Sequence, residues 1–421
     1  MFITAMASFA WANVNPTNYI GGVSFRPERD IPNLSGKVVL VTGGNTGLGK
    51  ESIRQILARN PAHVFLAARS EQNAKAAIED LKSSSSNANT DAKLTWLPLD
   101  LSSTKSVQDA AGSFKAQSSR LDILILNAGV MSLPPGETDL GHEIQLGTNH
   151  TGHFLLTKLL LPTLLRTAEE EEAGSSDVRV VSLSSIGHNL APSFETILDQ
   201  KKLKRCNTHA RYGASKVANI LFAAELARRY PSIMAVSVHP GLIATDLYAP
   251  LGKRNPVAAL GSRVLGAVGT PVEAGARNQL WAAVGAKRAE LVNGAYYVPV
   301  GNCKVHNRYV RSEEMGKELW EWTEKELRKG NANPSTAPGP DHKEGFLERT
   351  FQPHHAHHEQ QQQQEQKPVF ERRESQEEME IPAQPKPQHH RRRSSTLQRL
   401  KEYMGNQDEL DEAGKTYAKL M

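Results

Sequence analysis

The sequence predicts an α/β fold in which helices cover both faces of a parallel, doubly wound sheet. Short apolar runs alternate with longer segments of helical periodicity over residues 31–330. Most of these runs are apolar at nearly every position, as expected for strands that are buried on both faces. The first run leads directly into a glycine-rich turn that opens a helix. Alternation of this kind produces parallel strands with crossover helices, so we expect a single Rossmann-type domain with seven strands.

The expected strands are short, rich in β-branched residues and followed by turn or polar residues. In chain order they lie at 37–41, 64–68, 94–99, 121–126, 178–183, 233–238 and 295–300. The segments between them carry apolar residues at helical spacing, for example Ile53, Ile56 and Leu57 on one face of the first helix. The expected helices lie at 50–60, 71–81, 104–114, 143–166, 211–229, 271–284 and 312–328. Ligands of such sheets bind outside the carboxyl ends of the strands, so those ends are where a site is expected.

The whole chain of 421 residues is too polar to be one evenly packed globule, because its mean hydropathy is −0.47 and only 6% of its residues are aromatic. The composition changes near Asn331, after which come a proline-rich stretch, a histidine-rich run at 354–358 and a glutamine run. Such segments bury too little apolar surface to offset the loss of chain entropy. We therefore expect an N-terminal arm at 1–30, a folded body at 31–330 and a mostly disordered tail at 331–421.

Two features of the tail have a functional and a simpler interpretation. The histidines of 354–358 are more typical of solvated low-complexity sequence than of a metal site. Arg391, Arg392 and Arg393 precede Ser394 and resemble the target of a basophilic kinase. We favour the simpler interpretation, in which this is a local basic cluster that no kinase recognises.

Composition excludes several classes of protein. No run of 18 apolar residues exists, so no membrane-spanning helix is expected. Cys206 and Cys303 are too few for a disulfide scaffold or a cysteine-rich zinc site, and no metal is expected. A net charge of +5 permits nucleic-acid binding, but no interleaved aromatic residues support it. Residues 1–14 contain no Lys or Arg, which favours a loose arm over a secretory signal. We expect a cytoplasmic protein. Its N-terminal arm is compatible with peripheral contact with a membrane.

The glycine-rich turn after the first strand is expected to hold a dinucleotide cofactor. Gly43 permits the tight turn, Gly47 lets the backbone approach a pyrophosphate, and Gly49 allows the helix to pack closely. The helix N-terminus then offers N–H groups and a positive dipole to the phosphates. The residues expected to contact the cofactor here are Thr42, Gly43, Asn45, Thr46, Gly47, Leu48 and Gly49.

The end of the second strand favours NADP(H) over NAD(H). NAD-binding chains place an acidic residue there, about 20 residues after the glycines, to bind the ribose 2′-hydroxyl. Here Arg69 and Ser70 follow the strand, and both can bind a 2′-phosphate. The alternative is that Arg69 is a surface residue and that Glu71 takes the place of the acid. After the third strand, Asp100, with Leu101 beside it, is expected either to contact the adenine edge or to cap the next helix.

Tyr212 and Lys216 stand four residues apart on an expected helix and therefore share one face. A phenol normally has a pKa of about 10, and a neighbouring ammonium stabilises its phenolate form. The pair can then act as general acid or base on a carbonyl or an alcohol. The same spacing also arises by chance, in a surface tyrosine beside a solvated lysine. Further motifs along the chain support the catalytic interpretation, with the residues Asn127, Ala128, Gly129, Asn149, Ser185, Pro240, Gly241 and Thr245.

With these motifs in this order, the chain strongly resembles the classical short-chain dehydrogenase/reductase family over roughly residues 31–328. The segments 147–154 and 212–219 are similar to the branch of retinol dehydrogenases and WW-domain oxidoreductases, especially its fungal members. The resemblance implies a catalytic tetrad of Asn149, Ser185, Tyr212 and Lys216.

The resemblance also implies a role for each of these residues. Tyr212 exchanges a proton with the substrate while Ser185 orients the substrate oxygen, and Ser184 is the alternative for that serine. Lys216 hydrogen-bonds the nicotinamide ribose, and Asn149 holds a water that links Lys216 to solvent. The segment 127–129 supports the end of the sheet and the cofactor. The segment after the sixth strand is expected to run alongside the nicotinamide carboxamide, with the residues Pro240, Gly241 and Thr245.

These expectations describe an NADP(H)-dependent oxidoreductase that interconverts a carbonyl and an alcohol on a small, lipophilic or secondary-metabolite-like molecule. The alternative is a catalytically weak, cofactor-binding protein that acts through interactions of its tail. Members of the family often associate through helices such as 143–166 and 211–229, whereas this branch is often monomeric, so the oligomeric state stays open. The Lys-rich insert 191–210 is expected to shape the substrate entrance.

Overall fold

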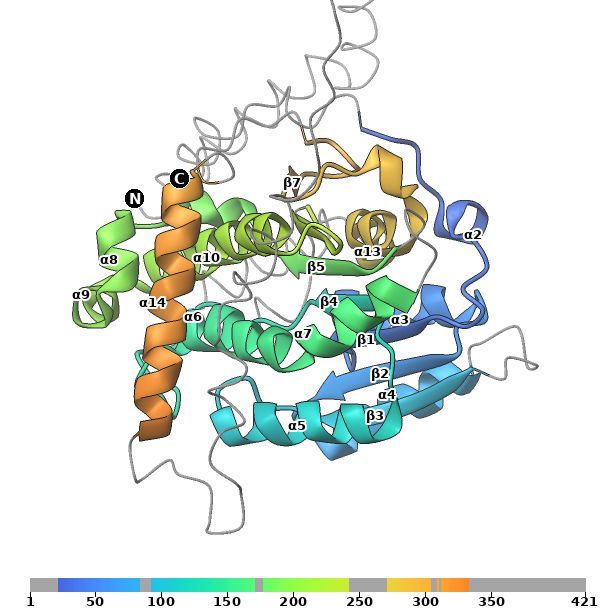
Figure 1. Cartoon of the computed structure of the whole chain (residues 1–421), viewed down its shortest axis with the longest axis horizontal. Coiled ribbons are helices and arrows are strands. Elements are labelled where there is room, and N and C mark those ends of the chain that lie inside the picture. The colour runs from blue at the N-terminus through green and yellow to red at the C-terminus, as the bar shows by residue number, and fades with distance from the viewer. Residues whose placement is uncertain are drawn as a thin grey trace, which may run out of the picture. The chain divides into compact units, whose positions relative to one another are not determined.

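A computed structural model of the chain describes residues 22–83, 92–170, 177–241, 271–303, 309 and 312–332. Its centre is a sheet of seven parallel strands in the order β3-β2-β1-β4-β5-β6-β7, with helices on both faces (Figure 1), so the predicted fold class is confirmed. The predicted arm up to residue 21, nearly all of the tail and Thr245 lie outside the described residues.

All seven strands lie close to their predicted positions in the chain, and their register places the first strand inside the sheet, between the second and the fourth. Val39 of β1 pairs with Val64 of β2 on one side and with Ile123 of β4 on the other. The strand order therefore reverses between β1 and β4, and such a switch point is where doubly wound sheets bind ligands. The strands are β1 Val38–Thr42, β2 His63–Ala68, β3 Lys93–Pro98, β4 Ile123–Leu126, β5 Arg179–Leu183, β6 Met234–Val238 and β7 Tyr296–Tyr297.

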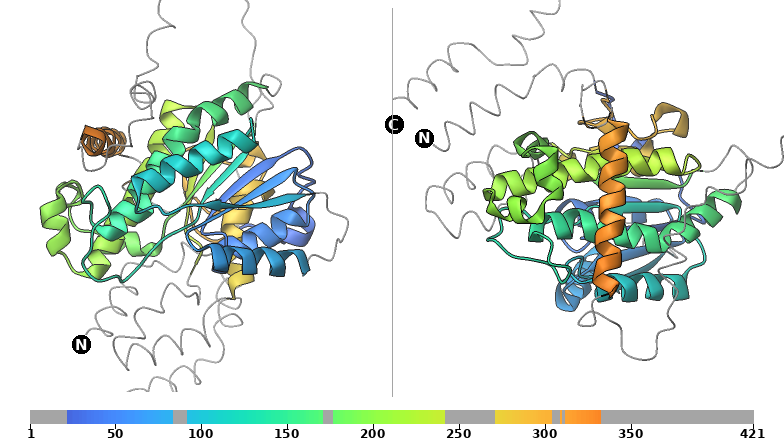
Figure 2. Two further views of the ribbon diagram at one scale, coloured as in Figure 1. Left: turned by 90° about the horizontal axis from the view of Figure 1, so that it is seen from below. Right: turned by 60° about the vertical axis from the view of Figure 1, so that its left-hand side comes forward.

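The helices form two layers, one on each face of the sheet (Figures 1 and 2). One hydrophobic core joins the sheet to α3, α4 and α13, and another joins it to α5, α7 and α10. The long helices are α3 Gly47–Leu57, α4 Glu71–Ser83, α5 Thr104–Gln117, α7 Gly152–Glu170, α10 Thr208–Arg229, α13 Val272–Leu280 and α14 Glu313–Ala332. The short ones are α2 Pro27–Asp30, α6 Ile144–Leu146, α8 Phe194–Leu198 and α9 Gln200–Arg205.

Helix α14 crosses the outer side of α7 and α10 (Figure 2, right). Its Trp320 is fully buried and lies nearly parallel to Phe222 of α10, with ring centres 6.0 Å apart. The Trp320 ring also meets Phe154 of α7 edge-on at 4.7 Å. Lys158 Nζ of α7 pairs with Glu324 at 3.0 Å. Aromatic packing and a shielded ion pair therefore attach the last described helix to the body.

Four predicted elements differ from the structure. The helix expected at 143–166 is divided into α6, a π turn over Gly147–Thr151, and α7. The helix expected at 271–284 ends in a second π turn, Trp281–Gly285. The strand expected at 295–300 is shorter, because Val298 pairs with Asn302 in a turn instead of continuing along β6. The predicted helix at 312–328 extends to Ala332, two residues beyond the expected end of the body.

The insert 191–210 folds as the helices α8 and α9, whose Phe194, Ile197 and Leu203 are buried. None of the helices in the described ranges is both long and apolar enough to cross a membrane.

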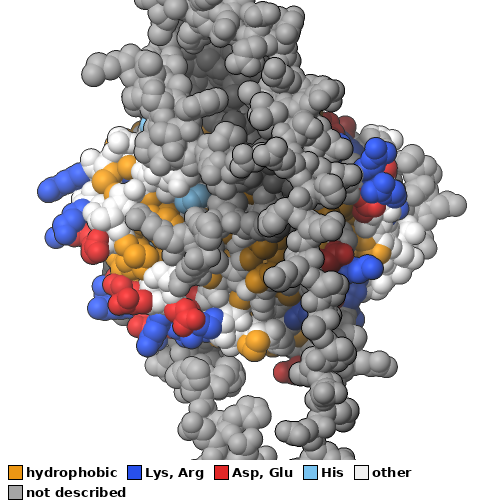
Figure 3. Space-filling view, turned by 90° about the horizontal axis from the view of Figure 1, so that it is seen from above, with side chains coloured by type: hydrophobic (Ala, Val, Ile, Leu, Met, Phe, Trp, Pro, Cys, Tyr) orange, Lys and Arg blue, Asp and Glu red, His pale blue; other side chains and the backbone are white. Residues whose placement is uncertain are grey.

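On the face seen in Figure 3, acidic and basic side chains lie close together along the margins of the described surface. This mixing agrees with the small net charge of +5.

Candidate active site

The loop between β1 and α3 forms a tight turn that leaves the start of α3 open. Gly43 has a φ of +64° and Gly47 a φ of +52°, in the left-handed region that glycine adopts without strain. A Cβ on Gly49 would collide with the carbonyl of Gly43, so only glycine allows α3 to approach the turn so closely. Asn45 lies in the turn, and Thr46 is the N-cap of α3, whose first turn has no acidic residue. Such a helix start suits a phosphate.

Residues at the end of β4 fasten this turn to the middle of the sheet. Asn127 Nδ2 donates to the carbonyl oxygens of Thr42 and Gly43, at 2.9 and 3.3 Å. Thr42 Oγ1 accepts a hydrogen bond from Ala128 N at 3.0 Å. The structure therefore brings the two predicted cofactor segments together at the switch point of the sheet.

Two amide side chains on α13, which sequence reasoning missed, hold the same region. Gln279 Nε2 donates to Ser52 Oγ of α3 at 2.7 Å and lies 3.3 Å from the carbonyl oxygen of Leu48. Asn278 Nδ2 donates to the carbonyl oxygen of His239, just after β6, at 2.7 Å. Both amides are buried. The sequence gives no distinctive signal for them, because α13 also carries the charged residues Glu273 and Arg277.

The side chains expected to select the cofactor lie between β2 and α4. Arg69 is exposed and directly follows β2. Ser70 Oγ accepts from Asn73 N at 3.3 Å, at the start of α4. Glu71 forms an ion pair with Lys75 at 2.7 Å along the same helix. Glu71, which was the alternative residue for binding the ribose, therefore makes this contact with its own helix.

Asp100 follows β3 and does not cap α5. Its Oδ1 accepts hydrogen bonds from the backbone N and the hydroxyl of Ser102, at 2.9 and 2.6 Å. The N-cap of α5 is Ser103, whose Oγ accepts from Ser106 N. Leu101, beside Asp100, is buried. The capping role expected for Asp100 is therefore wrong, and its contact with the adenine edge stays a prediction.

Tyr212 and Lys216 lie together on the buried side of α10, as their spacing predicts. Lys216 Nζ lies 5.5 Å from the centre of the Tyr212 ring and donates to the carbonyl oxygen of Leu183, the last residue of β5, at 3.0 Å. Asn219 Nδ2 donates to the same oxygen at 2.8 Å. Burial lowers the pKa of Lys216 to about 8, because desolvation disfavours the ammonium.

The two adjacent serines after β5 have different surroundings. Ser184 is buried, and its hydroxyl donates to the carbonyl oxygen of Lys216 at 2.8 Å. Ser185 begins a 3-10 turn, and its Oγ accepts from Gly187 N at 3.1 Å. A Cβ built on Gly187 would lie 2.8 Å from the Tyr212 ring and 3.4 Å from Ser185 Oγ. Ser185, rather than Ser184, therefore has its hydroxyl close to the tyrosine.

Asn149 lies in the π turn before α7 and is fixed by its side chain. Its Oδ1 accepts from Val130 N at 2.7 Å, and its Nδ2 donates to Val130 O at 3.0 Å and to Ser215 Oγ at 2.9 Å. A Cβ on Gly129 would lie 3.4 Å from Asn149 Oδ1 and 3.5 Å from Lys216 Nζ. The structure thus gathers the four residues of the predicted tetrad around Gly129 and Gly187.

Known proteins share this architecture and much of the sequence. The profile of the short chain dehydrogenase family matches residues 37–194. The short-chain dehydrogenase/reductase drtF of Aspergillus calidoustus is 37% identical over 310 residues, a match that covers 71% of this chain and 96% of the relative. The chain belongs to the short-chain dehydrogenase/reductase family.

Two further similarities support this membership. Retinol dehydrogenase 12 of Mus musculus is 36% identical over 290 residues, covering 68% of this chain and 85% of that protein. The crystal structure of an uncharacterised protein from Mycobacterium paratuberculosis superposes with a TM-score of 0.52 at 27% identity, over 73% of this chain and 98% of the other. As a short-chain dehydrogenase/reductase, this chain is an oxidoreductase of carbonyl or alcohol groups, in a family that uses NAD(H) or NADP(H).

In this short-chain dehydrogenase/reductase, Pro240 and Gly241 follow β6 at the carboxyl edge of the sheet. Gly241 has a φ of +100°, a backbone conformation that favours glycine. His239 is buried, and burial lowers its pKa to about 3, so the ring is neutral. Asn278 holds the carbonyl of His239, which fixes the direction in which the chain leaves the strand.

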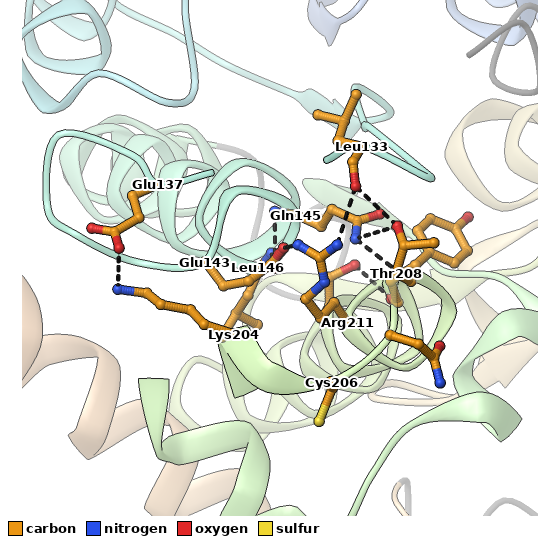
Figure 4. Close-up of polar contacts among 12 residues, drawn as sticks. Leu133, Glu137, Glu143, Gln145, Leu146, Lys204, Cys206, Thr208 and Arg211 are labelled. Atoms are coloured by element: carbon orange, nitrogen blue, oxygen red, sulfur yellow. Dashed lines mark hydrogen bonds and ion pairs between the residues drawn. The ribbon is translucent and has the colours of Figure 1, made fainter. Parts of the chain in front are cut away.

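A buried polar network, also missed from the sequence, joins α6 to the first turn of α10 (Figure 4). Arg211 Nη1 pairs with Glu143 Oε1 at 2.9 Å, and both side chains are almost completely buried. Arg211 Nη2 donates to the carbonyl oxygen of Leu133 at 3.1 Å. Gln145 Nε2 donates to the carbonyl oxygen of Thr208 at 3.0 Å. The network ties the loop after β4 and the π turn of Asn149 to the helix that carries Tyr212.

Proposed function

We propose that this chain is an NADP(H)-dependent enzyme that interconverts a carbonyl and an alcohol on a small, lipophilic or secondary-metabolite-like molecule. One observation carries the proposal. The lysine, the tyrosine and the serine of the tetrad converge with Asn149 at the carboxyl edge of the sheet, next to the glycine-rich turn. General acid–base groups and a cradle for a dinucleotide therefore meet at one place.

The residues divide the work as follows. Ser185 donates to the substrate oxygen, and Tyr212 gives or takes the proton on that oxygen. The Lys216 ammonium favours the phenolate of Tyr212 and so brings the phenol into a range useful for proton transfer. Asn149 holds a water that returns protons from solvent to Lys216. When bound, the nicotinamide cofactor supplies or removes the hydride.

The cradle around the β1–α3 turn fits such a cofactor. The first turn of α3 carries no acid, and the turn has glycine at the positions of positive φ and of close approach. Arg69 and Ser70 favour the 2′-phosphate of NADP(H), since the Arg69 fork can pair with a phosphate. Glu71, the alternative acid, has an exposed carboxylate that pairs with Lys75 at 2.7 Å along α4.

The class of substrate is drawn from the relatives. Retinol dehydrogenases 12 and 13 are named for a lipophilic alcohol, and several other relatives are short-chain dehydrogenases/reductases of fungi. We extend that preference for lipophilic carbonyls and alcohols to this chain.

The proposal is tested by following NADPH consumption of the purified protein against a panel of lipophilic aldehydes and ketones. Wild type is expected to turn over part of the panel. Tyr212→Phe is expected to lose about 100-fold or more of kcat, as the loss of a general acid does. Ser185→Ala is expected to lose far more activity than Ser184→Ala. Equal activity of wild type and Tyr212→Phe would overturn the proposal.

A further inference from the structure

His153 is a buried histidine close to the tetrad that the proposed mechanism does not use. It is the second residue of α7 and follows the π turn that contains Asn149. Its Nδ1 lies 2.9 Å from the carbonyl oxygen of Asn149, and its Nε2 lies 2.8 Å from Thr42 Oγ1. One imidazole therefore connects the backbone of Asn149 with the last residue of β1, where the cofactor turn begins.

The partners determine which ring nitrogen carries the hydrogen. A carbonyl oxygen only accepts, so Nδ1 of His153 is the donor to Asn149. Nε2 of the neutral ring then accepts from the hydroxyl of Thr42, whose oxygen accepts from Ala128 N at 3.0 Å. The hydrogen bonds all point the same way, from β4 through Thr42 and His153 to the carbonyl of Asn149. Bonds arranged in series polarise one another and hold their acceptors in place.

The ring of His153 stays neutral at physiological pH. Burial, together with the nearby charge of Lys216 and opposed in part by the bond to the Asn149 carbonyl, lowers its pKa to about 4. Protonation would turn Nε2 into a donor and reverse the direction of its bond with Thr42, so the series of hydrogen bonds described above belongs to the neutral ring.

The carbonyl of Asn149 is the group on which His153 acts. The side-chain oxygen and nitrogen of Asn149 already bond to Val130 and Ser215. Since these side-chain atoms already have protein partners, we assign the relay water to the backbone carbonyl oxygen of Asn149, which His153 Nδ1 holds. The π turn, in which Gly152 N bonds to Gly147 O, alters the ordinary helical direction of the carbonyls at this point.

We propose that His153 is a positioning residue for catalysis, which holds the Asn149 carbonyl in the orientation that binds the relay water of Lys216 and anchors it to β1 through Thr42. The inference rests on the proposed function, since it requires the relay from Asn149 to Lys216. It assigns to Thr42 a second role besides its place in the cofactor turn, because the Thr42 hydroxyl bonds to Nε2 of His153 and links the ring to β1.

The test uses His153→Gln and His153→Asn in the full-length chain. Asparagine keeps an N–H near the position of Nδ1, whereas glutamine keeps a polar group only near Nε2. With NADPH and a carbonyl that wild type reduces, His153→Gln is expected to lower kcat about tenfold, part of what acid–base catalysis contributes. Because proton delivery becomes slower, its solvent isotope effect on kcat should rise and the isotope effect of 4-deuterated NADPH should fall. His153→Asn should change both isotope effects less than His153→Gln does, because it keeps the N–H that bonds to the Asn149 carbonyl and loses only the contact with Thr42.

His150→Gln is the matched control. His150 is buried in the same π turn, and its Nε2 lies 2.9 Å from Thr323 Oγ1 of α14, away from Thr42 and the relay. His150→Gln should lower the melting temperature while leaving both isotope effects unchanged. Wild-type isotope effects in His153→Gln, or the same change in His150→Gln, would overturn the inference.

If His153→Gln does not fold, Thr42→Val is measured in the same way. It removes only the hydroxyl that accepts from Ala128, and unchanged isotope effects in this variant would also overturn the inference. Failure of the proposed function is recognised separately. In that case Tyr212→Phe would keep wild-type turnover, whatever the His153 variants do.

Discussion

Lys216 is the residue at which catalysis and stability conflict most clearly. Its ammonium is buried, and burial lowers its pKa from 10.5 to about 8. A difference of this size corresponds to about 3 kcal/mol of unfavourable charge burial. Because the pKa is lower in the folded protein, the cost is complete below about pH 8. It decreases as the pH rises toward 10.5 and disappears above that value, where the lysine is neutral in both states.

Lys216→Met should therefore stabilise the cofactor-free protein at pH 7 by about 1–3 kcal/mol, since the lost hydrogen bond to Leu183 offsets about 1 kcal/mol of the gain. Activity should be lost. Urea unfolding at pH 7 measures the expected gain in the free energy of unfolding. The same experiment at pH 10.5 should show no such gain. Lys75→Met, at an exposed position of α4, is the control and should change stability little. A variant less stable than wild type at pH 7 would contradict the argument.

Arg69 is the residue that we propose selects NADP(H) over NAD(H). Arg69→Ala should raise the KM for NADPH by about 10–100-fold, as expected for loss of a charge-assisted phosphate contact of about 1.5–3 kcal/mol, and leave the KM for NADH unchanged. Glu71→Gln is the matched variant and should alter neither value, because Glu71 pairs with Lys75. Initial rates with both cofactors provide the measurement. A rise in the KM for NADH in Glu71→Gln would instead favour the alternative in which Glu71 binds the ribose.

The sequence predicted those site residues whose role depends on local chain geometry. Gly43, Gly47 and Gly49 are required by backbone angles and by close contacts within one turn, so their spacing alone identifies the turn. His153 and Gln279 were not predicted, because their partners lie more than 100 residues away in the chain. Nothing in the local pattern distinguishes such a buried polar residue from an ordinary one.

The most informative element is the segment from α6 to α7, where one predicted helix became three pieces. Periodicity identified it as helical, and both flanking parts are helical. The π turn at 147–151 was not visible, because an insertion of this kind preserves apolar spacing on either side. It is supported by contacts from elsewhere, among them the Asn149 bonds to Val130 and the buried pair of Glu143 with Arg211.

Breaking that buried pair should be costly. Arg211→Met leaves the carboxylate of Glu143 buried with fewer partners, and loss of one member of such a pair costs about 3–5 kcal/mol. Burial already raises the pKa of Glu143, in spite of its hydrogen bonds. The double variant Glu143→Leu/Arg211→Met should lose less than the two single variants together. Urea unfolding measures all three, and a single-variant loss below about 1 kcal/mol would show that the pair does not stabilise this junction.

At the scale of the whole molecule, the pattern of strands and helices was enough to predict the sheet, since apolar runs and crossover helices permit few topologies. The position of α14 was not predictable. Its amphipathic pattern indicates a helix but not the surface that it covers. In the structure it lies over α7 and α10, with Trp320 between Phe154 and Phe222.

Trp320→Ala should therefore destabilise the folded body by about 3–5 kcal/mol, as truncation of a buried aromatic residue does. Trp322→Ala is the control. Trp322 is only half-buried and stacks on His142 at 5.3 Å, so its loss should cost less. Thermal or urea unfolding compares the two variants. Equal losses would contradict the view that Trp320 anchors the last described helix.

The central claim, that Tyr212 acts with a bound nicotinamide cofactor in carbonyl reduction, is tested most directly by following one deuterium atom. Wild type and Tyr212→Phe are each incubated with 4-deuterated NADPH, carrying the label on the face from which hydride leaves, and with a lipophilic carbonyl. The products are then analysed by mass spectrometry. The account predicts one deuterium on the carbinol carbon of the wild-type product and about 100-fold less labelled product from Tyr212→Phe. Unlabelled product from wild type, or equal amounts of labelled product from both proteins, would contradict it.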